Sequence, residues 1–178
     1  MSNELFPIEF KAVGDQGEIE GYASNFGNRD LAGDIVQRGA FARSLKSRPA
    51  GAVAMLWGHD QKRPIGVWNE ITEDHLGLRV KGRILTQTTD GRDAYEFARA
   101  GAVRGLSIGY RTTRARRDIE RKARLLEEVD LHEISLVAIP ANPLSGLESV
   151  KSHCPDRARR LVGQLNAAAA AMRAGEQA

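Results

Sequence analysis

Alternating apolar and polar positions recur along most of the chain and predict β-strands. The alternation is clear over residues 6–12 and 19–23, which a glycine-containing turn separates, so these two runs read as an opening hairpin. A continuous apolar run at 52–57 is of strand length and predicts a strand buried on both faces. Alternation resumes over 65–71 and 78–84, and three such runs in succession favour a meander.

Two further strands and three helices complete the prediction. Residues 105–110 alternate strictly, and an apolar-rich segment at 125–139 ends at Pro140, so it reads as a central strand. Helical spacing predicts short helices at 40–48 and 89–101, the second with Ala94, Phe97 and Ala98 on its apolar face. Thr89 or Asp90 would cap this helix, and Gly101 would follow its end. A third helix, amphipathic and rich in alanine, is predicted from Pro155 onward.

About seven or eight mostly sequential strands with two or three helices predict a mainly β, antiparallel, barrel-like fold with peripheral helices. With 178 residues, the chain is long enough for one core and an appendage. The domain boundaries that follow are 1–150 for the barrel and 151–178 for a C-terminal helical tail.

The amino-acid composition indicates the cellular compartment in which we expect the protein. Cys154 is the single cysteine, which excludes an internal disulfide framework and a multi-cysteine zinc site and favours a reducing, cytoplasmic compartment. The first residues have neither a basic leader nor a long apolar run, and no segment reaches the ~20 apolar residues of a membrane span. We therefore expect neither secretion nor a membrane partner.

The net charge of +3 is uneven, because seven arginine and lysine residues crowd positions 111–124. A solvated loop or hairpin tip is the commoner explanation of such a run, and nucleic acid or an acidic protein is the alternative partner. Nucleic-acid binding is disfavoured, because residues 111–124 contain no aromatic side chain on which a base could stack.

Ser107 lies between Gly105 and Gly109 on the polar face of its strand, a hydroxyl with room on both sides. A serine nucleophile facing an extended peptide would need that clearance, whereas a small-residue strand at a tight crossing is the structural alternative. The same residues satisfy the G-x-S-x-G pattern of α/β-hydrolases. That fold is rejected, because its sharp strand-to-helix turn conflicts with alternation continuing through Tyr110.

Acyl transfer by serine needs a base and a group that orients it. We assign Ser107 as nucleophile, His59 as general base and Glu133 as the orienting group, with His132 as the alternative third member because periodicity does not decide between neighbours. The structural alternatives are a loop histidine bonded to backbone for His59 and a salt bridge for Glu133. A zinc-protease helix is disfavoured, because Leu136 stands where the second histidine belongs. No metal or cofactor is expected.

Several motifs in order resemble the prohead maturation proteases of tailed phages, over roughly residues 6–150. The motifs are Gly21-Tyr-Ala-Ser, Asp30-Leu-Ala-Gly-Asp34 through Gly39-Ala-Phe41, Leu56-Trp-Gly-His59, Gly105-Leu-Ser-Ile-Gly-Tyr110 and Glu133-Ile-Ser-Leu-Val-Ala-Ile-Pro-Ala-Asn-Pro143.

This resemblance implies an assemblin-like antiparallel β-barrel, as in herpesvirus assemblins, in which His59 and Ser107 form the catalytic pair. Assemblins have a histidine as third member, whereas the phage family has the glutamate matched by Glu133. Assemblins also place paired arginines near the oxyanion, whereas this chain has Ala141-Asn142, so the oxyanion donors are unassigned and backbone N–H groups would serve.

The biology that the resemblance implies is cleavage of scaffold, or of the scaffold-like N-terminal segment of the major capsid protein, inside the assembling prohead in the host cytoplasm. Self-cleavage and a homodimer belong to the same expectation. The basic stretch and the C-terminal tail are candidates for scaffold contact, and the tail also for autoprocessing. The alternative function is a non-catalytic scaffold or capsid-assembly protein on the same fold.

Overall fold

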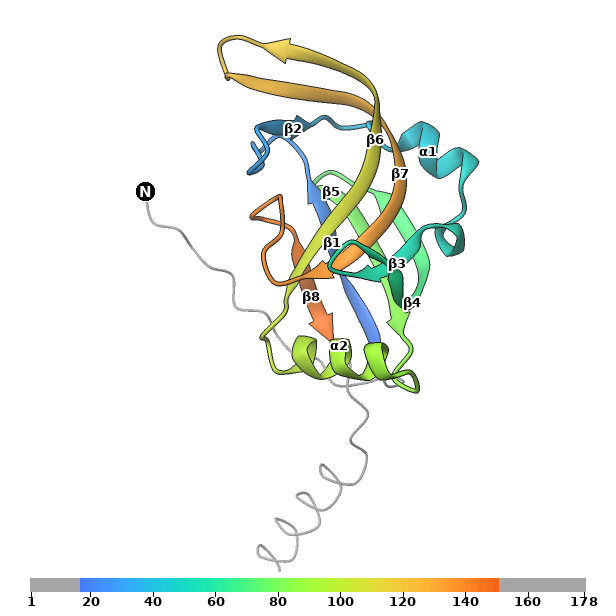
Figure 1. Cartoon of the computed structure of the whole chain (residues 1–178). Coiled ribbons are helices and arrows are strands. Elements are labelled where there is room, and N and C mark those ends of the chain that lie inside the picture. The colour runs from blue at the N-terminus through green and yellow to red at the C-terminus, as the bar shows by residue number, and fades with distance from the viewer. Residues whose placement is uncertain (1–16, 151–178) are drawn as a thin grey trace, which may run out of the picture.

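Strands account for most of the ordered backbone in residues 17–150, the part of the chain that the computed structural model describes (Figure 1). The elements are β1 (Glu18–Asn25), β2 (Asp34–Val36), α1 (Ala42–Ser47), the 3₁₀ turn η1 (Ala50–Ala52), β3 (Ala54–Trp57), β4 (Asp60–Glu73), β5 (Gly77–Ile84), α2 (Thr89–Arg99), β6 (Gly105–Asp118), β7 (Ala123–Val137) and β8 (Gly146–Val150). The expected strand at 6–12 and the expected helix from Pro155 lie outside the described residues.

The strands form one sheet in the order β2-β7-β3-β4-β5-β1-β8-β6, and β6 also pairs with β7. That last pairing closes seven strands into a barrel and leaves β2 as an outer strand on β7. The prediction of a mainly β barrel is confirmed, as is the meander, because β3, β4 and β5 pair antiparallel in succession. The parallel exceptions are β2 and β3, which both run alongside β7.

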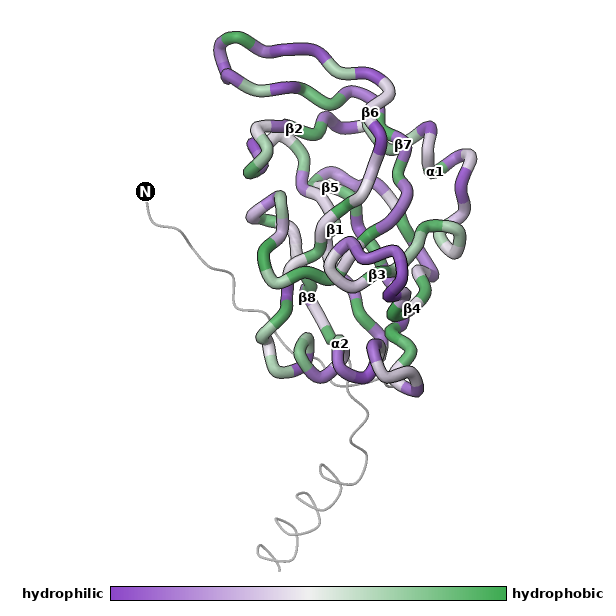
Figure 2. Tube along the Cα trace, viewed as in Figure 1, coloured by the Kyte–Doolittle hydropathy of each residue, from purple (hydrophilic) through white to green (hydrophobic). Residues whose placement is uncertain are grey.

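The barrel interior is filled mainly by apolar side chains of the strands. Figure 2 shows how hydrophobic and hydrophilic positions succeed one another along the backbone. The largest fully buried side chains of this core come from the strands: Trp68, Met55, Ile65, Leu78, Ile84, Leu106, Leu126, Leu131, Ile134 and Leu136. Phe41, in the turn before α1, joins them, whereas Leu125 is buried in a separate small cluster with Ile35 and Ala123. In β5 the alternation predicted from the sequence is confirmed, since Leu78 and Val80 are buried and Arg79 and Lys81 lie toward solvent.

The apolar run at 52–57 behaves differently from its prediction. Its beginning forms the 3₁₀ turn, in which the amide of Ala52 donates to Pro49 and that of Val53 to Ala50, so the strand itself is shorter. Ala54 is exposed, and therefore this strand is not buried on both faces along its whole length. Proline and glycine at the start of the run favour the turn over an earlier start of the strand.

The N-cap of helix α2 is Thr88, one residue before the expected Thr89 or Asp90. The Thr88 side chain accepts a hydrogen bond from the amide of Gly91, whereas Asp90 binds the guanidinium of Arg63. The helix ends as predicted before Gly101, whose φ of 75° is left-handed. Phe97 is not part of the buried face: 48% of it is exposed, and Tyr95 is buried in its place.

The basic stretch forms the far end of the β6–β7 hairpin, which extends beyond the barrel (Figure 1) and is largely hydrophilic (Figure 2). Arg114 and Arg116 both pair with Glu127 across the two strands. The prediction of a solvated hairpin is therefore confirmed. Within residues 17–150, no helix has the length and apolar character needed to cross a membrane.

Candidate active site

His59 lies in a tight turn between β3 and β4. Gly58 and His59 have φ values of 60° and 64°, and Trp57 pairs with Asp60 on either side of them, as in a two-residue hairpin turn. A left-handed backbone is uncommon for a residue other than glycine and requires surrounding contacts to hold it. The imidazole itself is 46% exposed and thus open to a substrate.

Glu133 of β7 is the partner of this histidine. Its Oε1 lies 2.6 Å from Nδ1 of His59, although the two residues are 74 positions apart, and only 12% of the carboxylate side chain is exposed. An ionised carboxylate only accepts hydrogen bonds, so Nδ1 carries the proton and Nε2 of the neutral ring is left as an acceptor. Within the described residues, no lysine or arginine pairs with Glu133. The charge of Glu133 therefore acts on His59.

Ser107 lies on β6, the neighbour of β7 in the barrel wall. Its Cα partner is Ser135, and directly opposed residues of antiparallel strands point to the same face of a sheet, so Ser107 shares the face of Ser135 and Glu133. The residue is 4% exposed and lines a cavity of about 80 Å³. Its hydroxyl makes no hydrogen bond to another described residue, including His59. The structure thus joins base and acid directly and brings the serine to the same face.

The glycines beside Ser107 are explained by the chain's own side chains. A Cβ on Gly109 would lie 2.1 Å from Oε1 of Glu133, and one on Gly105 would lie 2.7 Å from Cδ of Pro140. The clearance expected for a substrate is therefore occupied on both sides, and the tight-crossing explanation holds for the glycines. At Gly109 that crossing serves the candidate site, because only glycine leaves room for the carboxylate.

Ser135 is a site residue that the sequence analysis missed. Its Oγ accepts a hydrogen bond from the amide of His59 at 3.0 Å and donates one to Oε2 of Glu133 at 2.7 Å. The signal was present in the sequence, since Ser135 follows Glu133 by two positions and so shares its face of the strand. The pattern alone does not mark it as a site residue, because serine in an apolar strand also fits a plain packing role.

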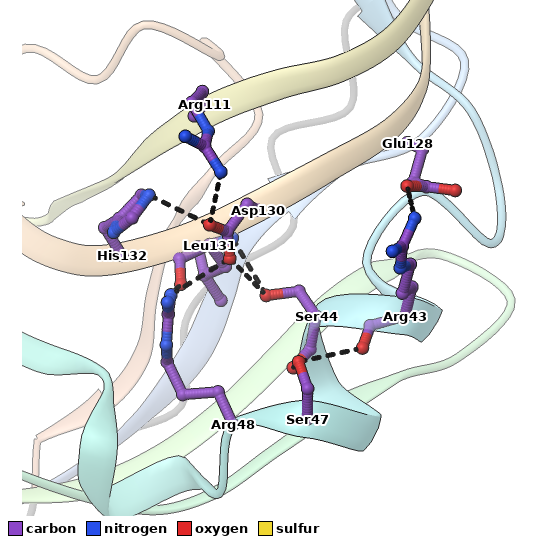
Figure 3. A network of polar contacts seen from close by, with 9 residues as sticks. All are labelled: Arg43, Ser44, Ser47, Arg48, Arg111, Glu128, Asp130, Leu131 and His132. Atoms are coloured by element: carbon purple, nitrogen blue, oxygen red, sulfur yellow. Dashed lines mark hydrogen bonds and ion pairs between the residues drawn. The ribbon is translucent and has the colours of Figure 1, made fainter.

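The alternative third member, His132, belongs to a different cluster (Figure 3). Its Nε2 lies 3.2 Å from Asp130, which also receives Arg48 at 3.2 Å and Arg111 at 3.6 Å. Ser44 of α1 lies 3.5 Å from the same carboxylate and accepts the amide of Leu131. This imidazole therefore points to an arginine-bound aspartate rather than to the candidate base.

A buried carboxylate, that of Asp34, links β2 to β7 through an ion pair with Arg124 and to the Ser107 strand β6 through Tyr110. The carboxylate of Asp34 accepts two hydrogen bonds from Arg124 and one from the Tyr110 hydroxyl. The Arg124 guanidinium lowers the pKa of Asp34, while burial, together with the nearby carboxylates, raises the pKa of Tyr110 to about 12. Asp34 and Tyr110 line the same small cavity as Ser107, so this pair fixes one of its walls.

Asn142 lies in the stretch compared with the assemblin arginines, and both protons of its side-chain amide are already used in hydrogen bonds. Its Nδ2 donates to the Asn25 carbonyl and to the Asn28 side chain. Backbone N–H groups therefore remain the candidate oxyanion donors. Among residues 17–150, no group of three histidine, cysteine, aspartate or glutamate side chains could hold a metal ion.

Comparison with known proteins gives consistent matches. A sequence model of the family described as caudovirus prohead serine protease matches residues 6–157. The prohead protease of Enterobacteria phage HK97 is 35% identical over 147 residues, and that of Escherichia phage T5 is 28% identical over 137, covering 82% and 76% of this chain. The chain spans 65% and 63% of the lengths of these two relatives.

A solved structure, the bacteriophage T4 capsid assembly protease gp21, aligns with a TM-score of 0.55. The alignment covers 68% of this chain and 81% of that protein at 14% sequence identity. At this identity the likeness concerns the fold alone, and it agrees with the barrel described above.

Proposed function

Because this chain belongs to the caudovirus prohead serine protease family, we propose that it is a serine endopeptidase of capsid maturation. The observation that carries the proposal is the contact between His59 and Glu133 on the barrel face that also bears Ser107. A protonated Nδ1 held by a carboxylate leaves Nε2 ready to accept the proton of a serine hydroxyl.

In the proposed mechanism, Ser107 Oγ attacks the scissile carbonyl while His59 Nε2 takes its proton. Glu133 orients the imidazole and stabilises the cation that forms. The proton then passes to the leaving amine, and water hydrolyses the acyl-enzyme with His59 again acting as base. Backbone N–H groups near Ser107 would bind the oxyanion. The free Ser107 hydroxyl fits an unliganded enzyme, in which catalytic hydrogen bonds are often long.

The proposed substrate is scaffold, or the scaffold-like N-terminal segment of the major capsid protein, cut inside the assembling prohead in the bacterial host. Cleavage of the protease itself and a homodimer are further parts of this proposal. Family membership supports the setting, and the exposed His59 ring supports access by an extended chain. The basic hairpin and the tail after residue 150 are the proposed scaffold contacts.

Intact-mass analysis of the cognate major capsid protein, co-expressed with this chain, tests the proposal. We expect the capsid protein to lose a defined segment with the wild type and to stay whole with Ser107→Ala, because the nucleophile is gone. Ser47→Ala on α1 is the matched control and should cut normally. If wild type and Ser107→Ala both leave it whole while shells assemble with this protein inside, the chain is a non-catalytic assembly protein.

A further inference from the structure

The Ser135 hydroxyl is the junction between the two chain segments that supply the candidate base and acid. The residue is fully buried on β7, and its Oγ makes one hydrogen bond to each segment. The bond it accepts comes from the backbone of His59, and the bond it donates goes to the side chain of Glu133. One atom of a fully buried residue therefore contacts both the base and the acid.

The turn that carries His59 needs this contact. With φ at 64°, the residue lies in a region that side chains disfavour, and its amide points to Ser135 rather than into the strand ladder. The acceptor of this bond is a fully buried hydroxyl, and either group would lose a hydrogen bond if the turn changed, so the Ser135 hydroxyl favours this turn conformation over alternatives. The preceding amide, that of Gly58, is held separately by the Leu136 carbonyl.

The carboxylate of Glu133 needs the same contact for its orientation. Each of its oxygens has one partner: Oε1 takes His59 Nδ1, and Oε2 takes the Ser135 hydroxyl. Oε1 occupies the space that a Cβ at Gly109 would fill. Without the hydrogen bond to Oε2 the carboxylate would be free to rotate, and the direction of its hydrogen bond with His59 Nδ1 would no longer be fixed.

We propose that Ser135 is a positioning residue of the catalytic centre, which sets the His59 turn and the Glu133 carboxylate relative to each other through one hydroxyl. This inference rests on the proposed function. It predicts that Ser135→Ala impairs the activation of Ser107 while leaving the barrel folded. Ser135→Thr, which keeps the hydroxyl, restores most of that activation.

The chain contains a matched control in the cluster of Figure 3. Ser44 is also buried, its Oγ also accepts a backbone amide, that of Leu131, and it also lies against a carboxylate, Asp130, beside a histidine. Ser44→Ala removes the same chemistry from a place that the mechanism does not use. If only Ser135→Ala loses activity, the cause is therefore the place of this hydroxyl between His59 and Glu133, and not the removal of a buried hydroxyl as such.

The activity test uses a fluorophosphonate probe, which bonds to the oxygen of an activated serine as fluoride leaves, and so needs no known substrate. In the full chain we expect labelling to be absent in Ser107→Ala, about 10- to 100-fold slower in Ser135→Ala, and unchanged in Ser44→Ala. Normal labelling of Ser135→Ala would overturn the positioning role. Absence of labelling in the wild type would instead show that the proposed function itself is wrong.

Amide hydrogen exchange supplies a readout independent of catalysis. In Ser135→Ala we expect the His59 amide to exchange at least about 10-fold faster, while the Gly58 amide, bonded to Leu136, keeps its wild-type rate. Equal acceleration at both positions would show general loosening of the turn and would contradict the inference. An unchanged rate at His59 would show that the hydroxyl does not hold this amide.

Discussion

Two adjacent residues of β7, His132 and Glu133, have opposite surroundings. Among the described residues, Glu133 pairs with His59 and with no lysine or arginine, whereas the aspartate beside His132 is already bound by two arginines. Charge that is already compensated polarises an imidazole weakly, while the free charge of Glu133 acts on its ring in a largely buried setting. This contrast favours Glu133 as the acid of the proposed triad.

Replacement of each residue by glutamine separates the two assignments. We expect Glu133→Gln to slow capsid-protein cleavage about 10³-fold or more, because the amide can hold the ring in the wrong tautomer. His132→Gln should retain cleavage within about threefold, because it removes only an exposed pair with Asp130. The measurement is a time course by intact mass. The reverse order of effects would make His132 the third member.

Among the elements, β7 organises the site. It pairs with β6, β3 and β2, and so sets the Ser107 strand, the His59 turn and the Asp34 strand against one another. The first half of β7 and the second half of β6 leave the barrel as the basic hairpin (Figure 1), and β2 pairs in parallel with the β7 strand of that hairpin. The ion pair between Asp34 and Arg124 fastens this junction.

Removal of the Arg124 charge tests how much the ion pair with Asp34 stabilises the protein. We expect Arg124→Met to lower the free energy of unfolding by about 3 kcal/mol, because it leaves the almost fully buried Asp34 carboxylate without its cation. Arg116→Met, from an exposed pair with Glu127, should change it by less than about 1 kcal/mol. Urea unfolding of both variants gives the comparison, and equal losses would contradict the role of the buried pair.

The pH dependence of the Arg124 effect has a defined sign. Arg124 lowers the pKa of Asp34 in the folded state, below the ordinary aspartate pKa of 3.8. The pair therefore stabilises the protein fully at pH values above 3.8, and this stabilisation is lost as the pH falls through the lowered pKa of the folded state. The difference between wild type and Arg124→Met should therefore shrink in acid. A constant difference would show that the arginine acts by packing alone.

For the whole molecule, two tyrosines, the buried Tyr22 and the partly buried Tyr110, predict sensitivity to alkali. Burial, with the help of neighbouring carboxylates, raises the pKa of Tyr22 and of Tyr110 to about 12 in the folded barrel, against 10.0 as the ordinary value. Unfolded chains thus lose these protons first, so stability is fully present below pH 10.0 and declines as the pH rises toward about 12. Thermal unfolding of the wild type and of the double variant Tyr22→Phe/Tyr110→Phe, at several pH values above 10, measures this loss. If the melting temperature of both proteins fell equally with pH, the prediction would be wrong.

The sequence by itself determined most of the strands, the hairpin that holds the basic run, the end of α2 at Gly101, and the three residues that we propose as catalytic. These features follow from local rules, because the face of a strand is set by a two-residue period and a helix end by the conformational freedom of glycine. A polar side chain in an apolar strand is visible in the same pattern. Such information needs no knowledge of distant partners.

Only the tertiary structure decided how those residues meet. The His59 contact with Glu133 depends on β3 lying parallel to β7 across 74 positions, a pairing that no local pattern contains. The register between β6 and β7 shifts where Gly109 faces Glu133 and Tyr110 faces Leu131, so His132 is left between them. A bulge breaks the two-residue period, so alternation alone does not predict whether His132 or Glu133 faces His59, and the packing of the barrel brings Glu133 into that contact.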